Sequence, residues 1–146
     1  MGSETITRIV RVPSGRSGEE MLDATRRQKS VGAESVKSMP RGAGDLTEVI
    51  FYRPKRWIKD DEDLDKELAE HNLVPADPYS QAQANIDDPA FADEHPNFSH
   101  WQDHNGKWHF AKYRLWNDER SVEVYHRTGE IGRGWWIACV RKSTVA

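Results

Sequence analysis

The sequence predicts an α+β protein in which an antiparallel sheet with C-terminal β-hairpins is backed by one or two helices. Residues 5–12 alternate β-branched with polar side chains, and residues 46–52 are rich in strand-forming types. Asn105-Gly106 separates the segments FSHWQDH and KWHFAKY, and Asn-Gly is the pair that type I′ hairpin turns favour. Residues 121–126 and 135–141 are two more alternating segments, so strands dominate the C-terminal third.

The Asn-Gly turn also predicts how the two strands of this hairpin pair. A two-residue loop makes Trp101 face Phe110 and places both of them, with Trp108, on the core side.

Two segments are predicted to be helical. Residues 18–29 follow Ser17, a capping residue type, and carry two glutamates in the first turn, where the helix dipole favours anions. Residues 60–71 form an acidic helix with a narrow apolar stripe of two leucines four residues apart.

The whole chain, 1–146, is expected to form a single domain. Residues 72–99 contain four prolines and predict a long irregular loop. Residues 30–45 are rich in glycine and serine and predict a second loop, whose composition permits mobility. Three aromatic side chains are expected to pin the longer loop to the body: Tyr79, Phe91 and Phe98.

Cysteine usage and hydropathy indicate an intracellular protein. Cys139 is the only cysteine, so no internal disulfide forms, and its apolar neighbours predict a buried structural thiol. No apolar run approaches the roughly 20 residues of a membrane span, and the first residues lack a signal-peptide pattern. We therefore expect a cytoplasmic protein without a membrane partner.

Charge is segregated along the chain. Residues 59–105 contain thirteen acidic and two basic residues, whereas residues 1–58 and 106–146 each carry a net charge of +4. The formal net charge of −3 therefore conceals an acidic middle between two basic ends. Such asymmetry bears on partners and solubility rather than on fold.

The acidic middle predicts a docking surface for a basic groove on a host protein or protein–nucleic acid complex. Trp57, beside the acidic helix, would supply an apolar anchor. Eight carboxylates would face the partner: Asp60, Asp61, Glu62, Asp63, Asp87, Asp88, Asp93 and Glu94. The competing interpretation is a solvated face that serves solubility alone.

A cluster of histidines predicts an alternative function, a metal-dependent hydrolase or nuclease. Four fall within fifteen residues, and Asp93 or Glu94 could complete a site with them: His95, His100, His104 and His109. On a strand, His100 and His104 lie roughly 13 Å apart, so one metal contacts two of these histidines and not three. The competing interpretation is that the histidines decorate the solvated face of the hairpin.

The C-terminal sheet suggests a further alternative, a nucleic-acid-binding module. Exposed aromatic side chains flanked by arginines stack on single-stranded bases. The region contains four tryptophans and four arginines of interest: Trp108, Trp116, Trp135, Trp136, Arg114, Arg120, Arg127 and Arg133. The competing interpretation places at least three of these tryptophans in the core.

The stretch from Ala76 to Lys142 resembles small, largely uncharacterised accessory proteins of phages and prophages. The likeness lies in ADPYS (76–80), DPAFADEHPN (88–97), HW (100–101), the Asn-Gly turn, DERSVEVY (118–125) and WWIACVRK (135–142). Such proteins include anti-CRISPR and other anti-defence inhibitors. The resemblance implies a non-enzymatic, cofactor-free inhibitor of a host defence or nucleic-acid-processing complex in an infected or lysogenic bacterium. It implies no catalytic residues, and the oligomeric state stays open.

Overall fold

The computed structural model describes residues 4–42, 44, 46–126 and 129–143. The strands in these ranges are β1 (Glu4–Arg11), β2 (Gln28–Val31), β3 (Leu46–Arg53), β4 (Leu73–Pro75), β5 (Asn97–Gln102), β6 (Trp108–Trp116), β7 (Glu119–His126) and β8 (Trp136–Arg141). The helices are α1 (Gly18–Ala24), α2 (Ala33–Ser38), α3 (Asp61–Ala69), α4 (Pro78–Asp87) and α5 (Phe91–Glu94).

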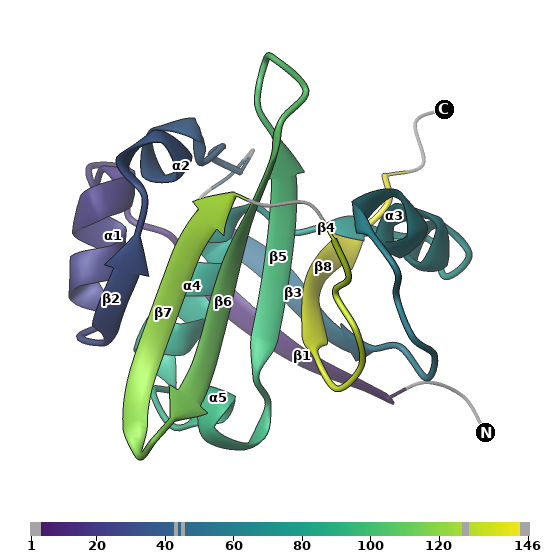
Figure 1. Cartoon of the computed structure of the whole chain (residues 1–146). Coiled ribbons are helices and arrows are strands. Elements are labelled where there is room, and N and C mark those ends of the chain that lie inside the picture. Colours follow the sequence, from purple (N-terminus) through teal and green to yellow (C-terminus); the bar gives the residue numbers. More distant parts are fainter. Residues whose placement is uncertain (1–3, 43, 45, 127–128, 144–146) are drawn as a thin grey trace.

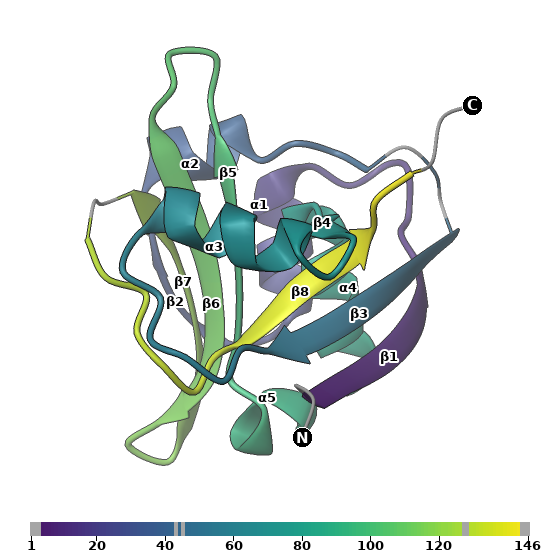
Figure 2. The same ribbon diagram turned by 90° about the vertical axis from the view of Figure 1, so that its right-hand side faces the viewer.

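All the strands belong to one mixed sheet in the order β1-β3-β8-β5-β6-β7-β2, and β4 pairs with β8 beside this path. Pairing is antiparallel except between β2 and β7 and between β5 and β8. The predicted α+β class is therefore confirmed, although the described ranges contain five helices rather than one or two. Figures 1 and 2 show the sheet strongly twisted, with α1, α2 and α4 on one side and α3 on the other.

Each face of the sheet has its own hydrophobic core. The larger core joins α1, α4 and α5 to the sheet and includes Met21, Tyr79, Phe91 and Trp136. The smaller core lies under α3, whose Leu64 and Leu68 are fully buried. Because β-strand side chains alternate between faces, neighbouring residues of the β5–β6 hairpin contribute to different cores.

Capping residues explain where the helices begin. Ser17 and Glu20 form a reciprocal capping box at α1, and Asp60 accepts a hydrogen bond from the Asp63 amide at α3. At α4, Asp77 caps the helix and Pro78 occupies its first turn, where the missing N–H costs nothing.

The predicted loop over 72–99 is wrong, because most of it is regular structure. It contains β4, α4, α5 and the start of β5. Prolines signalled irregularity, but Pro78 begins a helix rather than ending one. The aromatic anchors are confirmed, since Tyr79, Phe91 and Phe98 are all buried.

The predicted loop over 30–45 is also partly wrong, because it contains the end of β2 and all of α2. The first predicted helix, in turn, ends at Ala24 instead of reaching residue 29. Arg26 adopts a positive φ of 57°, which stops the helix and allows the chain to enter β2.

The predicted hairpin register is wrong by one residue. Trp101 pairs with His109, and Phe110 pairs with His100. The Asp103 carboxylate accepts hydrogen bonds from the Asn105 and Lys107 amides, which widens the connection beyond a two-residue turn, and Gly106 follows with φ 81°. A slip of one residue moves side chains to the opposite face of the hairpin. Trp101 therefore points to one face, and Trp108 and Phe110 point to the other.

None of the helices within the described ranges is both long and apolar enough to span a bilayer.

Candidate functional site

Two of the hairpin histidines, His100 and His109, are buried rather than solvated. His100 is buried on the α3 side of the sheet and lies between two carboxylates of that helix. Its Nδ1 is 2.6 Å from Asp61 Oδ1, and its Nε2 is 2.8 Å from Asp65 Oδ1. Burial alone would lower the pKa of His100, but hydrogen bonds to the two carboxylates and their charges outweigh burial and raise it. The ring also stacks on Trp108, with centroids 4.3 Å apart.

His109 occupies an equivalent position on the opposite face. Its Nδ1 is 2.8 Å from Ser35 Oγ in α2, and its Nε2 is 2.8 Å from Asp103 Oδ2. The hydrogen bonds from His109 and from the loop amides lower the pKa of Asp103 to about 2. The expectation of solvated histidines is therefore wrong for His100 and His109, because each one ties a helix or a loop to the hairpin.

Ser35, His109 and Asp103 have the composition of a hydrolytic triad but not its accessibility. In hydrolases the carboxylate holds Nδ1 of the imidazole and the serine lies at Nε2, an order that is reversed here. Ser35 and His109 have 0% and 1% of their surface exposed, so a substrate carbonyl cannot approach the hydroxyl. We assign this cluster a structural role.

The four histidines of the metal alternative do not converge. His100 and His109 point to opposite faces of the hairpin, His104 is exposed in its loop, and His95 stacks on Phe91 behind α5. In the part of the chain that the structure describes, no group of three His, Cys, Asp or Glu side chains could hold a metal ion.

The eight predicted docking carboxylates separate into two groups. Asp60, Asp61, Glu62 and Asp63 lie at the start of α3, whereas Asp87, Asp88, Asp93 and Glu94 lie at the end of α4 and in α5. Figures 1 and 2 place α3 well away from α5. The single acidic surface that the sequence suggested is therefore not assembled by the fold.

Several of these carboxylates have partners inside the molecule. Asp61 is buried against His100, and Asp60 caps α3. Asp63 accepts two hydrogen bonds of 2.9 Å from Arg56, and this contact holds the pKa of Asp63 at about 2. In the second group, Asp93 pairs with Arg120 at 2.9 Å and Asp88 lies 3.9 Å from Arg8. Glu62, which is exposed, accepts a hydrogen bond of 3.3 Å from the indole of Trp108.

Trp57 is presented to solvent from a fixed position. Half of its surface is exposed, although both of its neighbours in the chain are anchored. Arg56 binds Asp63 and also donates a 2.7 Å hydrogen bond to Glu67, and Ile58 is buried and bridges to Gly132. The backbone on both sides of the exposed indole is therefore fixed, which lowers the entropy that must be lost when a partner binds there.

The expectation that at least three of the four C-terminal tryptophans are core is wrong. Trp136 alone is buried, Trp108 and Trp135 are half-buried, and Trp116 is 56% exposed. Trp108 and Trp116 are the first and last residues of β6, so they lie at the two ends of the strand and outside both hydrophobic cores. Arg127 lies outside the described residues.

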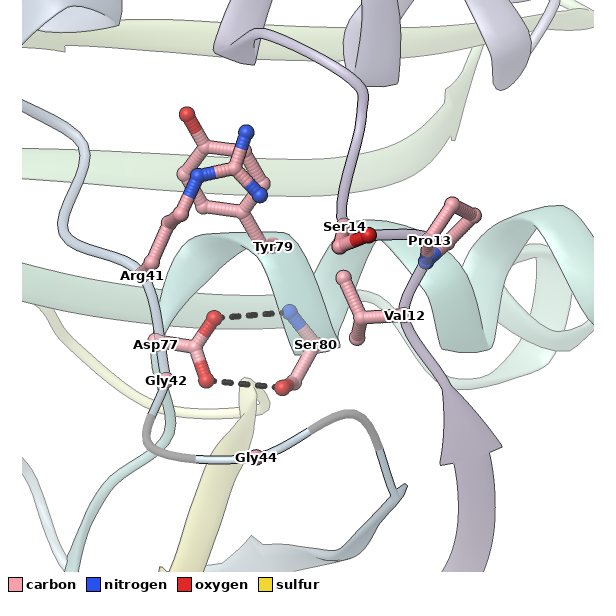
Figure 3. A pocket seen from close by; sticks show the side chains of 9 residues that line it. All are labelled: Val12, Pro13, Ser14, Arg41, Gly42, Gly44, Asp77, Tyr79 and Ser80. Carbon is pink, nitrogen blue, oxygen red and sulfur yellow. Dashed lines mark hydrogen bonds between the residues drawn. The ribbon is translucent and has the colours of Figure 1, made fainter.

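The cavity drawn in Figure 3, of about 280 Å³, lies between the end of β1, the glycine-rich segment after Pro40 and the start of α4. Its charged side chains already have partners within the molecule. Asp77 accepts hydrogen bonds from the amide and hydroxyl of Ser80, at 2.9 and 2.7 Å. Arg41 stacks over Tyr79 at 4.3 Å, and a Cβ on Gly42 would meet Asp77 Oδ1 at 2.4 Å. The charged side chains Asp77 and Arg41 that line the cavity are therefore engaged with neighbouring segments of the molecule.

Sequence reasoning missed the buried contacts of His100 and His109 and the helix α4. A signal existed for α4, because Asp-Pro at 77–78 is an N-cap followed by a first-turn proline. No local signal pairs Asp61 with His100 or Ser35 with His109, because these partners lie 39 and 74 residues apart in the chain.

Comparisons with protein-family models, with curated proteins and with solved structures found no match for this chain.

Proposed function

We propose that the protein is a non-enzymatic binding protein of the phage accessory type. It would inhibit a host defence or nucleic-acid-processing complex by surface contact in the bacterial cytoplasm. The observation that carries this proposal is the exposed Trp57 held beside the acidic helix α3. Tryptophan is prominent among the residues that dominate interface energies, and a fixed anchor binds with less ordering cost than a mobile one.

Charge on α3 supports a basic partner. Glu62 and Glu70 are exposed, and nearly half of the Asp65 side chain is accessible. Opposite charge on the partner would steer the encounter and speed association. We therefore limit the proposed contact to the solvent-facing side of α3 with Trp57 and omit the second group of carboxylates.

The test is capture from a bacterial host lysate with matched variants. Reversing Asp61 or Asp63 would damage the fold, because both bind cations within the molecule. We therefore choose Trp57→Ala and the double variant Glu62→Lys with Glu70→Lys, with Glu19→Lys on α1 as an exposed control. The partner should be lost with the first two variants, kept with the control, and held more weakly as salt rises.

Inhibition is then measured directly on the captured complex. Addition of the purified protein should suppress that complex's activity, and Trp57→Ala should not. A partner captured equally well by all variants, or one whose activity is unchanged, would show that the α3 side is not an inhibitory surface.

A further inference from the structure

A cavity on a different part of the surface is lined by two tryptophans and two arginines. It has a volume of about 350 Å³ and lies between the end of β6, α5 and the loop that leads into β8. Arg114 and Trp116 come from β6, and Arg133 and Trp135 come from the loop. The β6–β7 hairpin that borders it lies at the lower end of the molecule in Figure 2.

Cations of β6 hold both indoles in place. Lys112, Arg114 and Trp116 alternate along the strand and share one face. The Arg114 guanidinium lies 4.5 Å from the centroid of Trp116, and Lys112 Nζ lies 5.2 Å from that of Trp135. Cation–π contacts of this kind orient aromatic rings without covering them completely. Trp116 still exposes more than half of its surface.

The charge around the cavity is positive. A neighbouring cavity of about 340 Å³ shares Arg133 and Gly134 with it and adds Arg53 and Lys55. Of the carboxylates that line the two cavities, Glu4 pairs with Arg53 and Asp93 pairs with Arg120. Within residues 4–42, 44, 46–126 and 129–143, Arg133 has no ion-pair partner. An anion would therefore meet cations that internal carboxylates do not fully neutralise.

We propose that these two neighbouring cavities bind single-stranded nucleic acid. A base would stack on Trp116 or Trp135, and Arg114 and Arg133 would contact the flanking phosphates. Sites that bind single strands without sequence preference combine aromatic side chains, on which bases stack, with a positively charged groove for the backbone. A duplex hides the base faces that this site requires. The site is separate from α3 and does not depend on the proposed inhibition.

The test measures anisotropy of a labelled oligothymidylate of roughly ten nucleotides at low salt. Trp116→Ala should weaken binding by about 5- to 150-fold, the range that loss of one stacked base produces. Trp116→Phe should retain most of the affinity, because it keeps an aromatic face. Tyr125→Ala is the matched control, since Tyr125 is 48% exposed and does not line either cavity.

A second variant tests the phosphate contacts. Arg133→Glu should weaken binding, and Arg26→Glu, an exposed arginine on the α1 side, should not. Two phosphate contacts give a slope of log K against log salt of about −1.4 for the wild type, and losing one reduces it to about −0.7.

Several results would overturn the proposal. Absence of binding at low salt would do so, as would equal losses with Trp116→Ala and Tyr125→Ala. If duplex DNA bound as tightly as the single strand, the site would recognise phosphate charge alone and not stacked bases. An oligoglutamate peptide that binds in a Trp116-dependent way while the oligonucleotide does not would identify a protein ligand instead.

Discussion

His100 provides the sharpest test of how α3 is held, because its two carboxylate partners differ in exposure. The Asp61 side chain is 10% exposed, whereas that of Asp65 is 45% exposed. Removing one partner of a buried ion pair costs about 3–5 kcal/mol, and exposed pairs contribute about 0–1 kcal/mol. We expect Asp61→Asn to lower the free energy of unfolding by about 3 kcal/mol, because Asn keeps an acceptor oxygen. Asp65→Asn should lower it by less than about 1 kcal/mol.

The assay is urea unfolding followed by circular dichroism, with the m-value checked so that midpoints can be compared. The pH dependence has a defined sign. Because the pKa of His100 is raised above its ordinary value of 6.5, stability from the imidazolium is complete below that value. It is lost as the pH rises through the raised pKa. The cost of Asp61→Asn should therefore be larger at about pH 6 than at about pH 9.

Two results would refute this account. Equal costs for the two substitutions would mean that burial does not govern the strength of these contacts. A cost of Asp61→Asn that stays constant across the pH range would mean that His100 does not change its charge within that range, and the proposed pH dependence would be wrong.

The remaining predictions concern other internal contacts. Ser35→Ala should lower the free energy of unfolding by about 1–2 kcal/mol, because it leaves a buried nitrogen of His109 unpaired, as urea unfolding would reveal. Because burial raises the pKa of the Cys139 thiol well above its ordinary value, a thiol reagent at neutral pH should modify it only at the rate of unfolding. The pKa of Asp63 is about 2, against an ordinary value of 3.8, so its pair with Arg56 should stabilise the protein above pH 3.8 and be lost toward pH 2. In acid unfolding experiments, the variant Arg56→Gln should not show this loss of stability between pH 3.8 and 2.

The sequence was most informative where structure is set by neighbouring residues. The strands at 4–11 and 46–53 and the acidic helix follow from patterns within a few positions. The hairpin turn was located correctly, but its pairing was not, because the Asp103 side chain competes for the turn amides. That competition decides between loop lengths that differ by one residue, and propensity alone does not capture it.

The candidate surfaces could not be predicted from the sequence, because charge counted along a chain is not charge at a surface. Folding places Asp61 against His100 and Asp63 against Arg56, so the carboxylates nearest the N-terminus of α3 stabilise the fold. Glu67, later in the helix, is also buried and binds Tyr52 and Arg56, whereas Glu62 and Glu70 remain exposed to solvent. Only the three-dimensional structure distinguishes carboxylates that are paired inside the molecule from those that are exposed to solvent.

Trp57 connects the two proposed surfaces. A Cβ built on Gly132 would lie 3.7 Å from the Trp57 ring, and Arg133 of the basic cavity follows directly in the chain. Gly132 has a φ of 87°, which only glycine adopts without strain, so the backbone conformation at this point requires glycine, although a Cβ there would make only ordinary van der Waals contact with the indole. Backbone hydrogen bonds between Ile58 and Gly132 also attach the segment that carries Trp57 to the loop that carries Arg133 and Trp135. If a partner at Trp57 displaced this loop, it would change the affinity for nucleic acid, and by linkage the nucleic acid would change the affinity for the partner by the same factor.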